Sequence, residues 1–458
     1  MLDIYLTISL QADNRISINY NQGMEHFESL YPADSRFPEI EKVLSFIKKG
    51  NSCQIVGLPG VGRSNLLSLL SYNRTIREKH LSENQKWFHF VLCNFSEIRK
   101  KPLFEATKFI FLSLIDSLNE RKMEEYQRLN EIFKESASAN DELVLFQGLK
   151  RAIDFLSIEK ELTVVFLFDR FEEYISMLAS EFFANLRILR NRAKYRFSVI
   201  FSLNRPLEDL IEPMLFSDFY EFLAGTIVYL PLLDKPGLDF RISYLEKVSA
   251  KKIDSKTIEK VLKLTAGHGK LTRLCLEALT QEQRTKNEEL ETFLLNQKAV
   301  NGSLYEIWLS LIPSEQAEIL SKKYDSEYLG SVGLIKNNKI ELPLFENFIT
   351  QASIEKKEGK IYFDPQTKDI KKDDVVLTDI LTSSEFRLLK FLLENPDKII
   401  EREEIIKTVW SDAKSTEGVT DQALDQLVFR LRKKIEEDPN NPTRIHTLKG
   451  RGFRLHSI

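Results

Sequence analysis

The sequence predicts a three-layer α/β domain, followed by further helices and by two smaller α+β domains. Three observations predict this order. Short apolar runs alternate with helical segments between residues 50 and 232, a glycine-rich turn follows the first of these runs, and the chain ends in an amphipathic helix and a basic β-hairpin. With 458 residues, the chain is long enough for about three domains.

The glycine-rich turn, Gly57–Ser64, lies between an apolar strand and a helix. Its spacing is G-x-x-x-x-G-K-[ST], that of a P-loop, with Arg63 at the lysine position. Glycines let backbone N–H groups surround an anion, and the helix N-terminus adds its positive dipole end. The alternative is a glycine turn that binds no nucleotide. We expect ATP or ADP with Mg²⁺ to contact Gly57, Gly60, Gly62, Arg63, Ser64 and Asn65, with Ser64 as a metal ligand.

A second strand with a chemical signal is Thr163–Asp169, an apolar run that ends in a carboxylate. This is a Walker B pattern, which predicts Asp169 as a Mg²⁺ ligand and a catalytic-site residue; the alternative is a helix cap. Arg170 stands where a glutamate usually follows, so Glu172 becomes the candidate that positions water. The residues at positions 63 and 170 leave open whether ATP is hydrolysed or only bound.

The strands expected in the α/β domain end at residues that suggest a family. The apolar run 197–203 ends at Asn204, and a turn at 265–271 joins two helices. Together with the P-loop and the Walker B strand, residues 35–285 resemble AAA+ and STAND-type ATPases of the Orc-like branch. The resemblance implies that Asn204 lies by the γ-phosphate and that Lys270 or Arg273 is a second phosphate sensor. The five expected strands are 53–56, 88–93, 163–169, 197–203 and 228–232.

The helix predicted at Val419–Glu437 has two faces. Its apolar stripe recurs at helical spacing, and amides, a phenylalanine and a lysine lie opposite. Such groups can contact base edges, a thymine methyl and phosphates. A basic hairpin follows at Ile445–Leu455, which completes a winged helix-turn-helix pattern. The candidate DNA contacts are Gln422, Gln426, Phe429, Arg430, Lys433, Lys434, Lys449 and Arg451.

Several motifs in this region support a resemblance to the effector domain of OmpR/PhoB-type response regulators. They are Leu381–Phe386, Ile400–Ile405, Leu427–Pro439 and Thr447–Arg454. In that family the long helix enters the major groove and the wing reaches the minor groove, so the resemblance implies double-stranded DNA as a partner and Lys449 as the wing cation. The alternative is a winged helix that binds protein.

The expected domain boundaries follow from these motifs. The segment at 301–350 resembles the winged helix that follows the lid in STAND proteins. We expect an N-terminal extension at 1–34, a P-loop NTPase core at 35–232, a helical lid at 233–300, a winged helix at 301–350, a linker at 351–359 and a DNA-binding winged helix at 360–458.

Composition narrows the class of protein. The net charge is −3, so DNA affinity would have to come from a local patch, such as the eight Lys/Arg against three Asp/Glu in residues 430–454. The three cysteines are far apart, which is typical of a reduced cytosolic protein with neither a disulfide frame nor a zinc site. The basic start of a signal peptide is missing, and no apolar run approaches the roughly 18 residues of a membrane span.

We therefore expect a cytoplasmic transcription regulator in which nucleotide binding to the front module controls the DNA-binding domain. A homo-oligomer and RNA polymerase are candidate protein partners, and no membrane association is expected. Two alternatives remain open at this point. One is an active ATPase that acts on DNA as an initiator or loader, and the other is a signalling hub whose winged helices bind proteins.

Overall fold

The computed structural model divides the chain into two units, Met1–Glu346 and Asn347–Ile458, and each is considered separately. The described residues are 26–281, 289–357, 361–365, 367–372, 375–411, 420–436, 438–439, 442–448 and 450–456. Most of the expected N-terminal extension and the expected wing cation Lys449 lie outside them. Among the described helices, none combines the length and apolar content needed to cross a bilayer.

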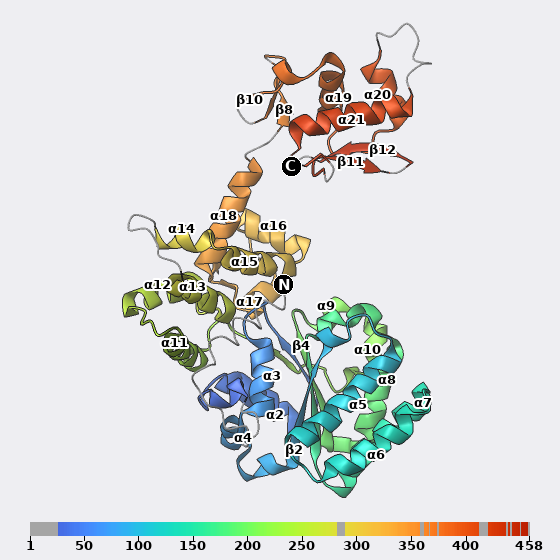
Figure 1. Cartoon of the computed structure of the whole chain (residues 1–458), viewed down its shortest axis with the longest axis vertical. Helices are drawn as coiled ribbons and strands as arrows, with labels where there is room; N and C mark the ends of the chain where they lie inside the picture. Colours follow the sequence, from blue (N-terminus) through green and yellow to red (C-terminus); the bar gives the residue numbers. More distant parts are fainter. Residues whose placement is uncertain are drawn as a thin grey trace. The chain divides into compact units, whose positions relative to one another are not determined.

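A five-stranded parallel sheet organises the N-terminal unit (Figure 1). Its order is β2-β3-β4-β1-β5, so the strand that precedes the P-loop lies between β4 and the edge strand β5. The expected strands are confirmed, although the last one is shorter and ends at Tyr229. The strands are β1 (Cys53–Val56), β2 (Phe88–Asn94), β3 (Thr163–Asp169), β4 (Phe197–Leu203) and β5 (Ile227–Tyr229).

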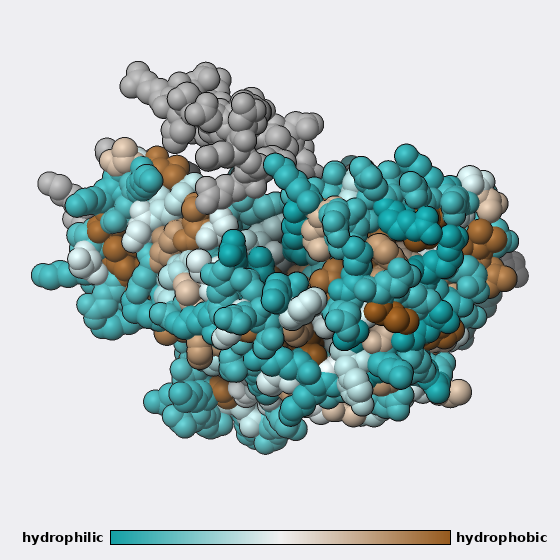
Figure 2. Space-filling model, turned by 90° about the horizontal axis from the view of Figure 1, so that it is seen from below, coloured by the Kyte–Doolittle hydropathy of each residue, from teal (hydrophilic) through white to brown (hydrophobic). Residues whose placement is uncertain are grey.

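Helices cover both faces of this sheet, which confirms the three-layer prediction (Figure 1). One side carries α2 (Phe37–Ile47) and α3 (Arg63–Tyr72), and the other carries α5 (Leu103–Glu120), α8 (Ser180–Ala193) and α10 (Pro213–Tyr220). All residues of β1 and β4 are buried, as expected for strands covered on both faces. One view of the surface shows a mainly hydrophilic face with small, scattered hydrophobic patches (Figure 2).

Further elements complete the N-terminal unit around the sheet. They are η1 (Phe27–Leu30), α4 (Arg74–Leu81), η2 (Ser82–Trp87), η3 (Phe95–Glu97), α6 (Glu125–Ala137), α7 (Glu142–Asp154), η4 (Phe155–Glu159), η6 (Ile175–Met177), η7 (Lys194–Arg196) and α9 (Leu207–Leu210). The short η1 is held to the core because the Asn73 side chain donates to the carbonyl oxygens of Glu28 and Tyr31, at 2.8 and 3.0 Å.

The lid begins with α11 (Lys235–Ser249), α12 (Ser255–Thr265) and α13 (Gly269–Gln281). The turn between α12 and α13 packs directly on the P-loop. Its His268 side chain is fully buried, and its Nε2–H donates to the carbonyl oxygen of Pro59 at 2.9 Å. Nδ1 accepts from the backbone N–H of Leu271 at 3.3 Å, so both ring nitrogens of a neutral imidazole are used. His268 is therefore a turn residue that joins the lid to the P-loop.

Helices and a hairpin follow the lid. They are α14 (Leu290–Leu295), α15 (Lys298–Ser310), α16 (Pro313–Ser321), α17 (Glu327–Ser331), the strands β6 (Ile335–Lys336) and β7 (Lys339–Ile340), and α18 (Pro343–Lys357). Helices α15–α17 followed by a two-stranded antiparallel hairpin are the arrangement expected for the first winged helix. The segment 351–359, expected as a charged linker, differs from that expectation, because α18 continues to Lys357.

The C-terminal unit is a small sheet followed by helices and a hairpin. Its elements are β8 (Ile361–Phe363), β9 (Ile370–Lys372), β10 (Val375–Val376), η8 (Thr378–Ile380), α19 (Ser383–Glu394), α20 (Arg402–Val409), α21 (Asp421–Ile435), β11 (Ile445–Leu448) and β12 (Gly452–Leu455). Strands β10, β9 and β8 form an antiparallel sheet, and β11 and β12 form the expected hairpin. The predicted winged helix-turn-helix architecture is thus present.

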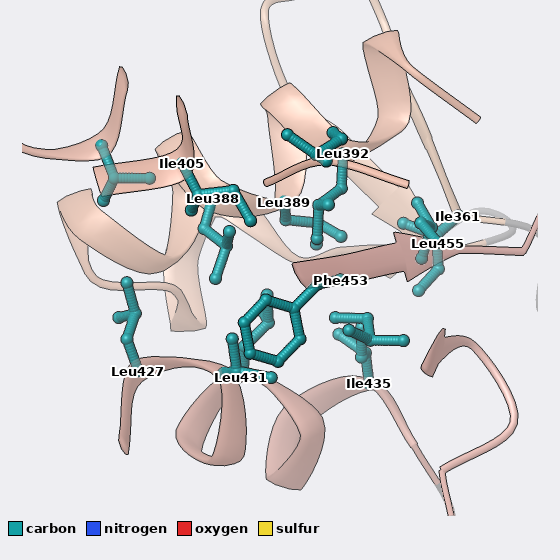
Figure 3. Packing of buried hydrophobic residues seen from close by; sticks show 14 of the residues in the cluster. Ile361, Leu388, Leu389, Leu392, Ile405, Leu427, Leu431, Ile435, Phe453 and Leu455 are labelled. Carbon is teal, nitrogen blue, oxygen red and sulfur yellow. The ribbon is translucent and has the colours of Figure 1, made fainter. Parts of the chain in front are cut away.

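One apolar core holds this unit together (Figure 3). Leu427 and Leu431 of α21 point into it, and Phe453 of β12 lies against them with its ring at the centre of the view. The core positions of α21 follow the helical spacing expected from the sequence: Leu424, Leu427, Val428, Leu431 and Ile435 are buried. Burying this face leaves the opposite face of α21 available to solvent.

The buried His268 predicts a pH effect on stability. Burial lowers its pKa from 6.5 to about 4, while an unfolded chain takes up the proton near 6.5. Between these values the unfolded state binds more protons, so this residue's contribution to stability is present above pH 6.5 and is lost as the pH falls to about 4. The contribution is at most about 3 kcal/mol. We expect His268→Gln to flatten the dependence of the thermal midpoint on pH in this range, whereas parallel curves for both proteins would contradict the assignment.

Candidate functional site

The P-loop connects β1 to α3 and depends on two glycines with positive φ. Gly60 has φ 81° and Gly62 has φ 111°, values that residues with a side chain rarely adopt. A Cβ at Gly60 would also lie 2.7 Å from the Cβ of Lys270 in the lid. The loop therefore approaches the lid closely, and both glycine positions are required by the backbone path that the motif predicted.

Ser64 and Asp169 meet at the carboxyl edge of the sheet. Ser64 lies in the first turn of α3, and its hydroxyl donates to Oδ1 of Asp169 at 2.9 Å. Asp169 is the last residue of β3 and is buried. A hydroxyl beside a buried carboxylate, at the start of a helix, fits the oxygen ligands that Mg²⁺ prefers. These two residues would hold the ion of a magnesium nucleotide, which supplies charge neutralisation at the phosphates.

Arg63 and Glu172 form an ion pair beside this hydroxyl and carboxylate. The Arg63 Nη1 and the Glu172 Oε1 are 2.9 Å apart, and the two side chains are only 13% and 17% exposed. Glu172 belongs to η5 (Phe171–Glu173), directly after β3. The sequence predicted that Arg63 binds phosphate and that Glu172 positions water. The structure brings them into contact with each other.

A cavity of about 640 Å³ lies over the P-loop. Asn204 lines it from the end of β4, as the resemblance implied, and its side-chain Oδ1 is buried without a hydrogen-bond partner among the described residues. The backbone oxygen of Asn204 accepts a hydrogen bond from the Tyr328 hydroxyl at 2.7 Å. The cavity is lined by Pro59, Gly60, Gly62, Arg63, Ser64, Asn65, Arg170, Glu172, Glu173, Asn204, Lys270, Glu306, Leu309 and Ser310.

The two candidate lid cations differ in their surroundings. Lys270 lines the large cavity, donates its backbone N–H to the Gly60 oxygen at 3.0 Å, and pairs through Nζ with Glu306 of α15 at 2.5 Å. Arg273 pairs with Glu277 at 2.8 Å and does not line that cavity. Arg273 lines instead the smaller cavity on the other side of the P-loop, together with Lys270. Both candidates therefore lie beside the P-loop, and of the two only Lys270 lines the large cavity.

A second cavity of about 190 Å³ adjoins the other side of the P-loop and contains residues that sequence reasoning missed. Tyr31, Asp234 and Arg241 line it, together with the buried Arg36. Arg36 donates through Nη1 to the Pro231 oxygen at 2.9 Å and through Nη2 to the Val61 oxygen at 2.6 Å. Burial lowers the pKa of Arg36, and the charge of Asp234 opposes this shift. A lone arginine before a Phe-Pro helix start carries no sequence signal for this role.

In the C-terminal unit, α21 presents a polar face opposite the core. The predicted contact residues Gln422, Gln426, Phe429, Arg430 and Lys433 are all exposed. Phe429, at 39% exposure, is the large apolar exception, and the Lys433 ammonium lies 4.9 Å from its ring centroid. The face therefore combines amides, an aromatic edge and cations in the pattern that base and phosphate contacts require.

Lys434 has a different environment from the one expected for a DNA contact. Its Nζ donates to the Ile380 oxygen at 2.7 Å and pairs with the buried Glu385 at 2.5 Å. Burial alone would raise the pKa of Glu385, but hydrogen bonds from Lys434 and Thr382 lower it below its usual value. Lys434 thus ties the end of α21 to the start of α19.

The hairpin that forms the wing depends on one close backbone approach. Gly452 has φ 136°, and a Cβ there would lie 1.9 Å from the Ile400 oxygen. The neighbouring Phe453 exchanges backbone hydrogen bonds with Ile400, at 2.9 and 3.0 Å. Arg432 of α21 also donates to the Ile445 oxygen at 2.6 Å. These contacts fix the hairpin, and Arg451 is exposed at its tip.

Comparison with known proteins identifies the C-terminal unit. Residues 379–455 match the family described as "Transcriptional regulatory protein, C terminal". A probable transcriptional regulator ycf27 of Cyanidium caldarium is 37% identical over 104 residues, which are 22% of this chain and 41% of the relative. The regulatory protein VirG of Rhizobium rhizogenes is 41% identical over 73 residues, 16% of this chain and 29% of the relative. The match thus spans less than half of these curated relatives.

Solved structures give weaker likenesses. The structure of the Klebsiella pneumoniae RstA DNA-binding domain in complex with its RstA box aligns with 22% of this chain. The alignment spans 94% of the RstA chain, with 23% identity and a TM-score of 0.19. A Walker-type ATPase of Pyrococcus abyssi covers 95% of this chain and 96% of that one, with 12% identity and a TM-score of 0.36. Since these scores are low, the N-terminal fold rests on the strand order and loop geometry described above.

The parallel sheet, the P-loop after its β1 strand and the Ser64–Asp169 contact give the N-terminal unit the fold of a P-loop ATPase. The C-terminal unit has the core, the exposed helix face and the hairpin of a winged helix. The chain therefore joins a unit with the P-loop ATPase fold to a C-terminal unit that matches the transcriptional regulatory protein family, of the OmpR/PhoB type, over residues 379–455.

Proposed function

We propose that the protein is a DNA-binding transcription regulator whose N-terminal unit controls DNA binding through nucleotide occupancy. The observation that carries the proposal is the exposed face of α21, which offers Gln422, Gln426, Phe429, Arg430 and Lys433 on a helix fixed by its own core. The partner is double-stranded DNA, with α21 in the major groove and the hairpin tip bearing Arg451 at the neighbouring backbone or minor groove. Self-association and RNA polymerase are proposed as further partners.

The face supports a division of labour between its residues. An amide side chain can bond two edge atoms of an adenine, and the Phe429 ring can contact a thymine methyl. Arg430 and Lys433 supply charge for phosphates, a contribution that does not depend on sequence. Since two further cations of this helix, Arg432 and Lys434, bond within the domain, the charge left for DNA is modest. Modest charge favours selective over indiscriminate binding.

The N-terminal unit offers the residues that a magnesium nucleotide needs. The P-loop glycines, Arg63 and Ser64 would contact the phosphates, with Asp169 completing the ion's surroundings. Lys270 would face the phosphates from the lid, and the second cavity, with Tyr31 and Arg36, would take the nucleoside. We propose ATP or ADP as the ligand, and Asn204 as the group that senses the terminal phosphate.

A buried ion pair gives this site a connection to the first winged helix. Arg205, the residue after Asn204, donates through both terminal nitrogens to the Glu315 carboxylate, each at 2.9 Å. Its guanidinium carbon lies 4.1 Å from the Tyr328 ring centroid, and the Glu315 side chain is 2% exposed. Burial would lower the pKa of Arg205, but the bonds and charge of Glu315 raise it. The end of β4 is therefore held by α16 and α17.

This contact supplies a route for control. A ligand that moves Asn204 must strain or break the adjacent Arg205–Glu315 pair, and interfaces of this kind switch between discrete arrangements. The Lys270–Glu306 pair adds a second connection, from the lid to α15. Because α18 follows these helices in the chain and leads into the C-terminal unit, we propose that nucleotide state changes their packing and thereby DNA binding.

Base recognition is tested by Gln426→Ala. Because the lost amide would read a base edge, we expect the variant to lose about 1–3 kcal/mol of discrimination at one position of the preferred sequence. The preferred sequence is first selected from a random DNA pool with the wild-type protein, and affinities are then measured for each single-base change. An unchanged preference in Gln426→Ala and in Phe429→Ala would mean that this face does not read bases.

Phosphate contacts are tested by a matched pair of cations. Arg430→Ala should weaken binding to all sequences and reduce the slope of log affinity against log salt by about one. Lys434→Ala should leave that slope unchanged, because Lys434 is bonded to Glu385 and Ile380, and should instead lower the unfolding midpoint of the C-terminal unit. The reverse assignment of the two effects would show that α21 meets DNA through another face.

The connection to the first winged helix is tested by Glu315→Gln. Leaving Arg205 buried without its carboxylate should cost about 3–5 kcal/mol locally. We expect faster hydrogen exchange over α16 and α17 and loss of the effect of magnesium-ATP on DNA affinity. Asp209→Asn is the control, since Asp209 is half-exposed and lies 3.5 Å from the same guanidinium. Unaltered nucleotide control in Glu315→Gln would contradict this route.

A further inference from the structure

The pair formed by Arg63 and Glu172 is close but poorly aligned. Although its N···O distance is 2.9 Å, Arg63 Nη1 and Glu172 Oε2 are both buried without a hydrogen-bond partner among the described residues. A guanidinium in this position has donors that no acceptor satisfies well. Because these buried donors are poorly satisfied, the guanidinium would bind more favourably to an anion with better-placed oxygens than to Glu172.

Neighbouring contacts hold Glu172 at this place. The chain turns sharply at Arg170, whose φ of 52° is left-handed, immediately after the last residue of β3. Phe171 then anchors the turn in the core, with ring centroids 5.0 Å from those of Phe95 and Phe201. The next carboxylate has other partners, because Glu173 pairs with Arg99 and Arg170. The backbone thus delivers one particular carboxylate to the P-loop cation.

The position of Arg63 makes it the contact point for phosphate as well. It is the first residue of α3, and it lines the cavity over the P-loop together with Ser64 and Asn65. A phosphate bound by the P-loop would bring several negative oxygens to the guanidinium that Glu172 already contacts. Two anions at one mostly buried cation repel each other, because screening by water is reduced there.

We infer that Glu172 is an internal competitor for phosphate at Arg63, so that nucleotide binding exchanges one anion for another. This inference rests on the proposed nucleotide-binding function and assigns its regulation. It replaces the water-positioning role expected for Glu172. Because Glu172 must be displaced first, a higher concentration of nucleotide is needed for binding. When phosphate binds Arg63, the turn that carries Glu172 after β3 is released.

The test compares Glu172→Gln with Glu161→Gln in the full-length chain. Glutamine keeps the size of the side chain and removes the charge, so Glu172→Gln should bind magnesium-ATP about tenfold more tightly, as expected for removing one close like charge. Glu161→Gln, whose carboxylate pairs with Arg196 just before the start of β3 and does not line the cavity, should bind like wild type. Isothermal titration calorimetry with ATP, ADP and tripolyphosphate measures the affinities, and the thermal midpoint of each variant shows that it is folded.

A double-mutant cycle with Arg63→Ala makes the test specific. If Glu172 acts through Arg63, the gain from Glu172→Gln should shrink markedly when Arg63 is absent, and tripolyphosphate should show the same ranking as ATP. Equal or weaker ATP binding by Glu172→Gln, with binding by the wild type intact, would overturn this inference alone. If none of the folded proteins binds any of the probes, the proposed nucleotide control itself is overturned.

Discussion

The parallel arrangement of β1, β3 and β4 is the constraint on which the N-terminal unit depends. Parallel neighbours bring their carboxyl ends to one edge, so residues far apart in the chain meet there. The hydroxyl of Ser64, the carboxylate of Asp169 and the end of β4 at Asn204 share this edge. The proposed roles of Ser64, Asp169 and Asn204 at the phosphates follow from that shared position, and so does the contact of β4 with the first winged helix.

The C-terminal unit depends instead on α21, where the residues that pack in the core and the residues proposed to contact DNA lie on opposite faces. The buried residues of α21 contact the hairpin and the preceding helices, while its other face carries the groups suited to DNA. The two roles do not compete, because helical periodicity assigns them to different sides. Stability and recognition can therefore change independently, except at Lys434, where a cation of the helix serves the fold.

Much of this architecture could be predicted from the sequence. Apolar strands, the P-loop glycines and the stripe of α21 are local patterns, and local patterns fix secondary structure and motif positions. Apart from the Ser64–Asp169 pair, which the motifs imply, pairings between distant residues could not be predicted. Glu172 faces Arg63, and Arg205 meets Glu315, only because of turns and packing that no short stretch encodes. The same reason explains why the roles of Arg36 and Lys434 were missed.

The hydrogen bonds of Arg432 and Lys434 within the domain have a consequence for how the protein would search non-specific DNA for its site. A helix that offered all of its cations to phosphates would be retained on random duplex by counterion release. If the domain binds DNA as proposed, the part of its charge that is bonded internally would not hold it on unrelated sites, and a larger fraction of molecules would stay in free solution. Under the proposed control, occupancy of a rare operator would then follow a change in the N-terminal unit promptly, because little protein would be bound to non-specific DNA.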